Sequence, residues 1–225
     1  MGDGNDDAQL GRGGNPPGGS DPVALRLRTG TSVNVILGAG DDRLEIANAD
    51  IGLQLNVVAG EGNDEVDFAT QFNNSDGGFQ LFPVVVRDHS YFNLGGGEDH
   101  LEIHSAFIQG QLVIQDGAGI AHLDLYNLNI ARKLDIDTSN EGDQIKIDYV
   151  QARDLTIDSN NGIDDVDITN SRFRSMILKL GSQRDSLFIR NSRATYLTRL
   201  DGGENGSSLA GSNNSLRGLL RRNIG

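Results

Sequence analysis

The sequence predicts an all-β fold, namely a parallel β-helix that we expect to be right-handed, with three strands per coil of about 22 residues and about eight to nine coils. The first observation is the window GAGDDRLEI at 38–46, whose pattern Gly-x-Gly-x-Asp-x-apolar-x-apolar returns along the chain. We refer to the first apolar residue of each copy as the anchor, and the anchors are Val23, Leu44, Val66, Leu101, Leu123, Ile145, Val166, Leu187 and Leu209. They are separated by 21, 22, 35, 22, 22, 21, 21 and 22 residues, and a repeat of this length is typical of a solenoid.

The second observation is that apolar residues stand in fixed columns around the anchors. Two residues after the anchor stand Leu25, Ile46, Phe68, Ile103, Leu125, Ile147, Ile168 and Ile189. Nine residues before it stand Val35, Val57, Phe92, Ile114, Ile136, Ile157, Leu178 and Leu200, and seven after it stand Ile51, Ile108, Ile130, Phe173 and Leu216. Alternation at period two indicates strands with one buried face. Stacked strands lie about 4.8 Å apart, so about eight coils make a rod on the order of 40 Å long.

The N-terminal segment, residues 1–18, is rich in Gly, Asp, Asn and Pro, and we expect it to be disordered or loosely docked. The motif occurs there once more, in Gly2, Gly4, Asp6, Ala8 and Leu10. Ala8 precedes Val23 by only 15 residues, which is too few for a coil. The solenoid is therefore predicted to span residues 19–213.

Two features interrupt or accompany the coils. Four residues after the anchor is a polar column, predicted to form tight left-handed turns and an amide ladder: Asn48, Thr70, Ser105, Asn127, Asn170, Asn191 and Asn213. The long step of 35 residues places an insertion of 13 residues within 70–90. Pro83 and the pair Gly77-Gly78 indicate a bulging loop there, which is either a tolerated excursion or a binding loop.

The last residues, 214–225, change pattern. Leu216, Leu219 and Leu220 have helical spacing and are predicted to cap the open end of the rod. Arg217, Arg221 and Arg222 would then face water. A tail that binds a partner is the alternative.

Composition narrows the function classes. The 225 residues include no cysteine, which excludes disulfides and thiolate metal sites. The formal net charge of −13 argues against nucleic-acid binding and suits cation binding or solubility. No apolar run approaches the ~20 residues of a membrane-spanning helix, and the N-terminus lacks the features of a secretory signal. Because the first repeat is incomplete, we expect a piece of a longer secreted or cell-surface protein rather than an intracellular one.

The repeated window resembles the nonapeptide repeat of RTX (haemolysin-type) calcium-binding proteins. The matching residues are Gly38, Gly40, Asp42 and Leu44, then Gly60, Gly62, Asp64 and Val66, and then Gly95, Gly97, Asp99 and Leu101. In that family the glycine turn supplies carbonyls and the aspartate supplies a carboxylate to Ca²⁺ between stacked turns. Later copies keep Asp143, Asp164 and Asp185 but lose glycines, while Ala121 and Ser207 lack the carboxylate. RTX arrays repeat every nine residues and bind ions along two edges, whereas this chain would have one such edge per coil.

The resemblance implies a calcium site whose ligands are Asp42, Asp64, Asp99, Asp143, Asp164, Asp185, Gly38, Gly40, Gly60 and Gly62, strongest between the coils of Asp42 and Asp64. Ca²⁺ takes six to eight oxygens at about 2.3–2.6 Å, which two stacked turns approach. Carboxylates ~5 Å apart repel by roughly 1 kcal/mol in water, so the row needs solvent, hydrogen bonds or a cation. The structural alternative is that each Asp bonds its own turn.

Other ionisable groups are weaker candidates. An acidic row one residue after the anchor is expected to be a solvated outer face, with Lys146 pairing to an acid beside it: Glu45, Asp67, Glu102, Asp124 and Asp167. His100 and His122 share a column, and His104 lies near Glu102, so a transition-metal site is the alternative to ordinary surface histidines. Arg87, Asp88 and His89 form the only compact candidate for catalysis.

Coil length and the Asn column resemble those of pectate-lyase-like β-helices, a resemblance that implies a fold and not an activity. We expect a non-catalytic, extracytoplasmic structural or adhesion-type module, stabilised by Ca²⁺, whose partner is an extracellular protein or a polysaccharide. The alternative is a polysaccharide-active lyase or glycoside hydrolase, with acids on one face and the insertion as a wall of the cleft. That alternative requires aromatic, His or Arg residues near the insertion and an acid out of line with its column.

Overall fold

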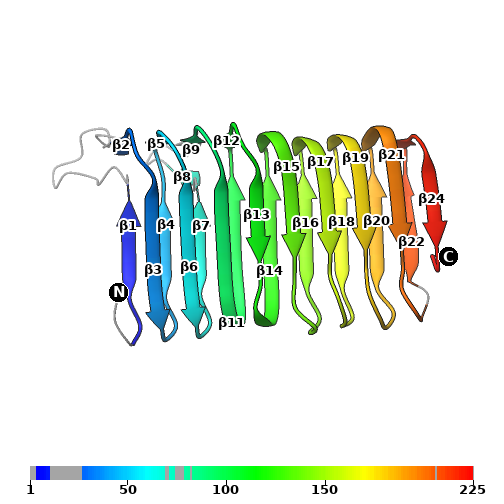
Figure 1. Ribbon diagram of the computed structural model, residues 1–225, viewed down its shortest axis with the longest axis horizontal. Helices are drawn as coiled ribbons and strands as arrows, with labels where there is room; N and C mark the ends of the chain where they lie inside the picture. The colour runs from blue at the N-terminus through cyan, green and yellow to red at the C-terminus, as the bar shows by residue number, and fades with distance from the viewer. Residues whose placement is uncertain are drawn as a thin grey trace.

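The computed structural model describes residues 4–10, 27–68, 71–73, 79–81, 83–205 and 207–224, and these form a β-solenoid of about 8 turns (Figure 1). Every strand pairing along the rod is parallel and joins strands one coil apart. The predicted fold class is therefore confirmed. Among the described residues no helix is long and apolar enough to cross a membrane.

Three parallel sheets run along the rod, and Figure 1 shows two of them as a front and a rear layer. The anchor sheet contains β1 (Asp7–Leu10), β4 (Arg43–Ile46), β7 (Glu65–Phe68), the end of β11 (Ser90–His104), β14 (Ala118–Tyr126), β16 (Gln144–Asp148), β18 (Asp165–Thr169), β20 (Ser186–Arg190) and β22 (Ser208–Ser212). The narrow sheet contains β2 (Leu27–Thr29), β5 (Ala49–Ile51), β10 (Val84–Val86), β12 (Ala106–Ile108), the starts of β15 (Asn129–Asp137), β17 (Gln151–Asp158), β19 (Arg172–Lys179) and β21 (Arg193–Asp201), and β23 (Ser215–Leu216). The return sheet contains β3 (Val33–Ala39), β6 (Leu55–Glu61), the start of β11, β13 (Leu112–Gln115), the ends of β15, β17, β19 and β21, and β24 (Leu219–Arg222).

The core is a set of apolar ladders along the rod axis. Leu44 pairs with Val66, Val66 with Leu101 and Leu101 with Leu123, as the repeat predicts. All four side chains are almost completely buried. Burial of each such side chain contributes about 1.5–3 kcal/mol, so the alternating columns are sufficient to drive coil stacking.

The turn after each anchor strand is left-handed, as the polar column predicts. φ lies between 49° and 58° at Asn48, Ser105, Asn127, Tyr149, Asn170, Asn191 and Asn213. Part of the predicted amide ladder is present, because Nδ2 of Asn213 donates to Asn191 and Nδ2 of Asn191 donates to Asn170, both at 3.2 Å. Thr70 lies outside the described residues. Tyr149 occupies this column as well, which the sequence pattern did not identify.

The glycine turns join the return sheet to the anchor sheet in the first coils. Gly38 and Gly60 pair across adjacent coils, with φ of 129° and 127°. A Cβ added to Gly60 would lie 1.6 Å from the carbonyl oxygen of Gly38. Glycine is therefore required both for the backbone conformation and for the close stacking of the turns.

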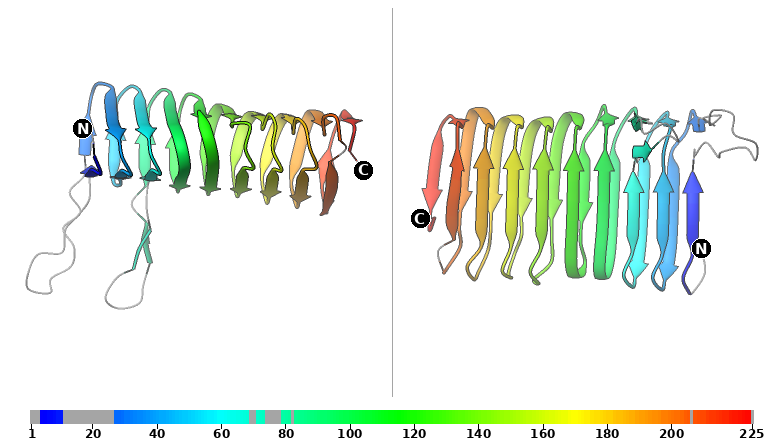
Figure 2. Two further views of the ribbon diagram at one scale, coloured as in Figure 1. Left: turned by 90° about the horizontal axis from the view of Figure 1, so that it is seen from below. Right: turned by 180° about the vertical axis from the view of Figure 1, so that it is seen from behind.

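The insertion is a hairpin. β8 (Gln71–Asn73) and β9 (Phe79–Leu81) pair antiparallel and form a separate two-stranded sheet. Figure 2 shows this hairpin projecting away from the rod on the side of the anchor sheet. The chain then re-enters the narrow sheet through β10, which pairs with β5 and β12.

Both ends differ from the prediction. Ala8 and Leu10, within the segment expected to be loose, pair with Leu44 and Ile46 in the anchor sheet. The predicted first anchor, Val23, lies outside the described residues. Ala8 therefore precedes its register partner Leu44 by 36 residues, a spacing that counting a constant period excluded.

At the C-terminus the predicted apolar helical stripe is wrong. Leu219–Arg222 form strand β24, which pairs with β21, and Leu220 is 61% exposed. The edge of β21 offers unpaired backbone groups, and strand pairing satisfies them along the segment. Leu216, by contrast, packs against the core.

Candidate functional site

The six predicted calcium-binding aspartates form one buried row at the turn before the anchor sheet. In the hydrogen bonds of this row, Oδ1 of an aspartate accepts from the backbone N–H of the equivalent residue in the preceding coil. The N–H of Asp42 donates to Asp64 at 2.8 Å, and the N–H of Asp64 donates to Asp99 at 2.9 Å. The same bond links Asp6 to Asp42, Ala121 to Asp143, Asp143 to Asp164 and Asp164 to Asp185. The alternative that each Asp bonds its own turn is wrong at these positions, because the carboxylates join successive coils.

The other oxygen of these carboxylates is poorly satisfied. Oδ2 of five members is buried without a hydrogen-bond partner of standard geometry in the described part of the chain: Asp42, Asp64, Asp99, Asp143 and Asp164. Oδ2 of Asp185 instead accepts from the hydroxyl of Ser207 at 2.8 Å. Desolvation of the charged form raises the pKa of Asp99 and of Asp164 to about 7. Neutralisation of these carboxylates, by a proton or by a bound cation, is therefore favourable.

The fit of this row to calcium is partial. A coil of this row offers at most one carboxylate oxygen that lacks a partner, whereas Ca²⁺ needs about six to eight oxygens. In the described residues no group of three or more acids or histidines converges on a point that could hold a metal ion. The turns of Gly38, Gly40, Gly60 and Gly62 stack directly beside the row, so a bound ion would take most of its ligands from backbone carbonyls.

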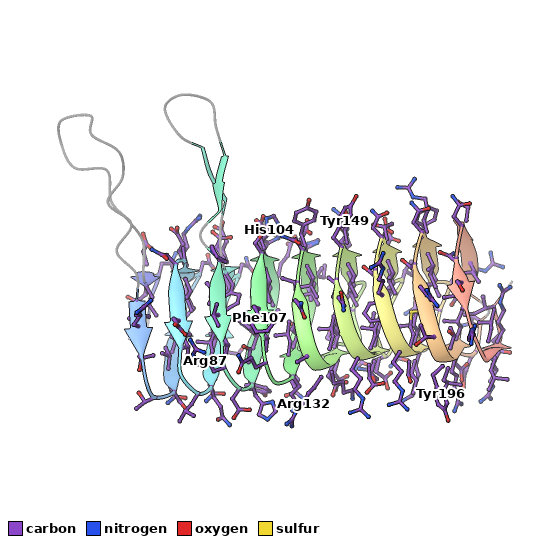
Figure 3. All side chains as sticks on the ribbon, turned by 90° about the horizontal axis from the view of Figure 1, so that it is seen from above. Arg87, His104, Phe107, Arg132, Tyr149 and Tyr196 are labelled. Atoms are coloured by element: carbon purple, nitrogen blue, oxygen red, sulfur yellow. The ribbon has the colours of Figure 1, made fainter. Side chains whose placement is uncertain are left out.

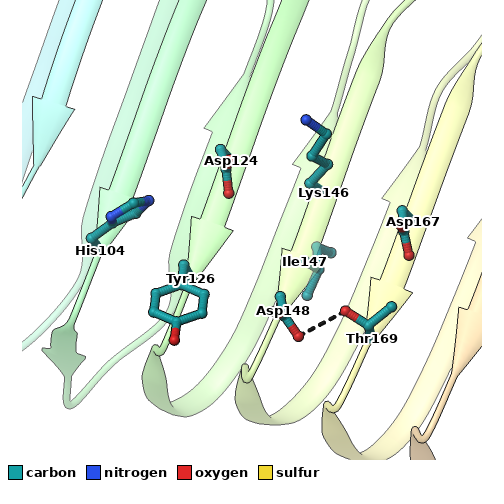
Figure 4. Close-up of a pocket in the computed structure, with 8 residues that line it drawn as sticks. All are labelled: His104, Asp124, Tyr126, Lys146, Ile147, Asp148, Asp167 and Thr169. Carbon is teal, nitrogen blue, oxygen red and sulfur yellow. Dashed lines mark hydrogen bonds between the residues drawn. The ribbon is translucent and has the colours of Figure 1, made fainter.

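A second site lies on the outer surface of the anchor sheet. A groove of about 420 Å³ crosses four successive coils, and Figure 4 draws the residues that line it. It is lined by His104, Asp124, Tyr126, Lys146, Ile147, Asp148, Asp167 and Thr169. Apart from the buried Ile147, these residues come from the column one after the anchor and the column three after it, which a strand places on the same face.

The polar part of the groove is held by the sheet register. Lys146 lies opposite Asp124 on one neighbouring strand and opposite Asp167 on the other. The predicted ion pair of Lys146 with either acid is not formed, since the described residues show no such contact within 4.0 Å. Asp148 accepts hydrogen bonds from the hydroxyl of Thr169 and the amide of Asn170, both at 2.7 Å. These bonds fix the Asp148 carboxylate at the edge of the groove.

An aromatic row runs along the same edge. The ring centroids of His104 and Tyr126 are 5.5 Å apart, and those of Tyr126 and Tyr149 are 5.8 Å apart. Tyr149 is 55% exposed and has φ of 54°, a conformation that bulky residues rarely adopt. Figure 3 shows His104 and Tyr149 pointing outward on the same side of the rod.

The outward acidic row is solvated over only part of its length. Glu45 and Asp67 are buried, and burial raises the pKa of Asp67. Arg43 contacts Glu65 at 2.6 Å and Asp67 at 2.7 Å. The prediction of a solvated face is therefore wrong at Glu45 and Asp67, while Glu102, Asp124 and Asp167 are half-buried.

The histidines and the Arg87 cluster do not form the predicted sites. His100 and His122 stack on adjacent coils with centroids 6.4 Å apart, but each of His89, His104 and His122 faces a different acid. Arg87 instead makes a two-point contact with Asp50, with both N···O distances at 3.0 Å. Its guanidinium is thus engaged between two coils of the narrow sheet.

Sequence reasoning missed the groove because its residues belong to two columns with different periodic patterns. The available signal was Tyr149, an aromatic residue in a column otherwise made of Asn, Ser and Thr. Asp148, an acid that precedes it outside the acidic row, was a second signal. Comparisons of the chain with protein-family models, with curated proteins and with solved structures find no match.

Proposed function

We propose that this chain is a non-catalytic, extracytoplasmic adhesion-type module that holds a neutral polysaccharide in the groove of the anchor sheet. The observation that carries the proposal is the aromatic row of His104, Tyr126 and Tyr149 beside a polar groove, in which both tyrosines are exposed. Ligand sites combine apolar and aromatic surface with a few placed polar groups. A sugar ring has both features, since its C–H face packs on an aromatic ring while its hydroxyls reach polar side chains.

The geometry favours an extended ligand over a small molecule. The groove is shallow and crosses four coils, and neighbouring strands in a sheet are about 4.8 Å apart. Tyr126 and Tyr149 follow one another along the rod axis with centroids 5.8 Å apart. A linear polymer lying along the rod can therefore place successive units on successive rings.

The charge of the groove sets the kind of polysaccharide. Asp124, Asp148 and Asp167 outnumber the single cation Lys146. A carboxylate accepts strong hydrogen bonds from hydroxyl groups but repels other anions. The groove therefore suits a neutral, hydroxyl-rich chain.

The backbone conformation of Tyr149 favours a role in ligand binding over a purely structural role for this residue. A non-glycine residue held at positive φ costs on the order of 1–3 kcal/mol, and such strain is concentrated at functional sites. Asparagine occupies the equivalent turn in the neighbouring coils, at Asn127 and Asn170. Retention of a strained, exposed Tyr149 is explained if the ring contacts a ligand.

The test is Tyr149→Asn, which restores the residue type of the column. We expect this variant to melt at a temperature equal to or above that of the parent chain, because asparagine relieves the strain. Its affinity for a neutral glucan or mannan oligosaccharide, taken from a panel by calorimetry, should fall by about tenfold, as expected for loss of a contact worth about 1.4 kcal/mol.

The matched control is Tyr196→Ser, which removes an equally exposed tyrosine from the opposite side of the rod. It should leave binding of the neutral oligosaccharide unchanged. Equal affinities of the parent chain and Tyr149→Asn, or no binding of any neutral polysaccharide by the parent, would reject the proposal.

A polysaccharide-active enzyme is the second candidate, and Asp148 is the observation that favours it. This acid stands outside the acidic row and is the register partner of Tyr126, which in turn pairs with His104. Paired acids flanking a sugar are the usual apparatus of glycoside hydrolysis. New reducing ends or unsaturated products in the binding mixtures, abolished by Asp148→Asn, would replace the non-catalytic proposal with this one.

We also propose that Ca²⁺ stabilises the rod at the aspartate row, as the likeness to RTX repeats implies. The support is the set of buried Oδ2 atoms without partners, strongest at Asp42 and Asp64 where the glycine turns are complete. A cation there would offset the repulsion between stacked carboxylates. Its ligands would be the aspartates and the carbonyls of the turns at Gly38, Gly40, Gly60 and Gly62.

A further inference from the structure

A column of arginines lies at the corner between the narrow and return sheets. The corner position lies two residues before a column of return-strand residues that pair from coil to coil, namely Leu134, Leu155, Met176, Thr198 and Leu219. In five successive coils it is occupied by Arg132, Arg153, Arg174, Tyr196 and Arg217. Two more arginines, Arg172 and Arg193, pair directly on the adjoining narrow sheet. We refer to these seven residues as the arginine edge.

The arginine edge is exposed and largely without acidic partners. All seven side chains are exposed, and Figure 3 shows Arg132 and Tyr196 pointing outward on the side of the rod opposite His104. Arg153 has an ion pair, with Asp154 at 3.5 Å, and the guanidinium of Arg174 lies 5.2 Å from the ring centre of Tyr196. The other four arginines make no ion pair with any described residue.

The arginine edge is positively charged, whereas the molecule as a whole is acidic. The formal net charge is −13, yet 14 of the 19 Lys and Arg residues and only 13 of the 32 Asp and Glu residues follow residue 128. Like charges one coil apart, about 5 Å, repel each other even in water. Stacking arginines in successive coils therefore disfavours the fold slightly, and an anionic partner would remove that cost.

We propose that the arginine edge binds a linear acidic polysaccharide that carries carboxylate or sulfate groups. Arginine presents a planar fork that matches such groups with two parallel hydrogen bonds. The coil repeat places the backbones of these arginines about 4.8 Å apart along the rod, and exposed Tyr196 offers a ring on which a sugar can pack. This binding is independent of the groove on the anchor sheet, whose acids repel anions.

The width of the arginine edge favours a polysaccharide over a nucleic acid. The strip is one to two residues wide, and the acids beside it on the return sheet already pair with cations: Asp135 with Lys133, Asp154 with Arg153 and Asp158 with Lys179. A single thin chain can follow this strip along the rod. A duplex is wider, so its phosphates beyond the strip would approach a molecule whose formal net charge is −13 and would be repelled.

The experiment compares two triple variants that remove the same charge. Arg132→Gln, Arg153→Gln and Arg174→Gln together remove three cations from the arginine edge. The control combines Arg184→Gln, Arg190→Gln and Arg221→Gln, three exposed arginines elsewhere on the rod that make no ion pair in the described part of the chain. Binding of labelled heparin and polygalacturonate oligosaccharides is followed by fluorescence anisotropy over a range of salt concentrations.

We expect the edge variant to raise the Kd for at least one of the two polyanions by about tenfold or more, and the control by less than about twofold. The slope of log Kd against log salt should fall by up to about three in the edge variant, one for each lost contact. Tyr196→Ser should weaken binding of the polysaccharide but not of inorganic polyphosphate, which has no ring to stack.

Three outcomes would overturn the proposal. The first is absence of binding of either polysaccharide by the parent chain at low salt. The second is an equal loss in both triple variants, which would mean that net charge and not the edge decides binding. The third is tighter binding of duplex DNA than of either polysaccharide, which would assign the edge to nucleic acid. Circular dichroism of each variant verifies that the solenoid is intact.

Discussion

At the residue scale, the left-handed turns hold residues whose side chains suit a positive φ and one residue, Tyr149, whose side chain does not. Asn127, Asn170 and Asn191 suit their positive φ because the asparagine side chain tolerates and supports this conformation. Tyr149 has the same φ with none of these advantages. The ring of Tyr149 lies against Tyr126 on the outer surface and is 55% exposed, so the local conformation is better explained by binding than by packing.

The glycine turns give a prediction at this scale. Gly60→Ala adds a Cβ 1.6 Å from the carbonyl oxygen of Gly38 at a φ of 127°. Because both the clash and the backbone strain must be relieved, we expect a loss of about 3 kcal/mol or more in the free energy of unfolding, measured in urea. Gly30→Ala is the control, since nothing lies within 4 Å of its added Cβ, and its effect should stay within about 1 kcal/mol. Similar urea midpoints for the two variants would contradict the close stacking of the turns.

At the element scale, the aspartate row behaves as one unit that crosses the coils. Each Oδ1 fastens the turn of the preceding coil, so the row contributes to stacking. At Asp99 and Asp164 burial disfavours the ionised form and raises the pKa, because the carboxylate has left water while its Oδ2 has no hydrogen-bond partner of standard geometry. The row therefore stabilises the rod through one oxygen and makes its stability sensitive to pH through the other.

This sensitivity has a defined direction. The pKa of Asp99 and of Asp164 rises from 3.8 to about 7 on folding, so the folded chain binds more protons than the unfolded chain between these values. Their contribution to stability is complete below about pH 4 and is lost as the pH rises through about 7. We expect the melting temperature to fall between pH 5 and pH 8. Asp99→Asn, which keeps the Oδ1 acceptor, should reduce that fall, whereas Asp165→Asn on the exposed face should not.

The same melting measurement also tests whether Ca²⁺ binds the aspartate row. If the cation neutralises the row, millimolar Ca²⁺ should raise the melting temperature relative to EDTA at pH 8, and by less at pH 5, where protons already do so. A melting temperature at pH 8 that does not respond to Ca²⁺ would leave the proton as the only neutralising partner. Greater stability at pH 8 than at pH 5 in EDTA would contradict the buried row itself.

At the scale of the whole molecule, the rod is quasi-one-dimensional, because each coil contacts only its neighbours. Stability in such proteins is close to a sum of terms for single coils and their interfaces. The faces of the rod are therefore independent in a way that faces of a globular domain are not. The groove on the anchor sheet and the arginine edge can change separately, since the core ladders between them are common to every coil.

Deletion of one complete coil tests this additivity. Removing residues 166–186 joins Asp165 to Leu187, and Val166 and Leu187 are register partners, so every column continues. We expect a folded rod about 4.8 Å shorter by small-angle scattering, with a single melting transition. Deleting only 166–176 brings return-strand residues into the anchor sheet and should abolish folding. A full-coil deletion that fails to fold would contradict the nearest-neighbour description.

The fold was predictable from sequence because its information is local and repeated. The anchors from Leu44 to Leu209, the left-handed asparagines and the position of the insertion all follow from period and residue type. The ends were less predictable. At Ala8 an excursion breaks the period, and at Leu219 and Leu220 the same spacing allows a helix or an edge strand, which only the presence of β21 decides.

By itself the sequence determined that this chain winds in coils, which side chains enter the core and which aspartates share one row, because a periodic pattern specifies its own register. Only the tertiary structure decided that the carboxylates bond the preceding coil, that Tyr126 and Tyr149 meet beside Asp148, and that arginines from successive coils share one corner. The physical reason is that these contacts depend on the lateral stacking of residues more than 20 positions apart and on the shape of the coil at its corners, which a period does not contain.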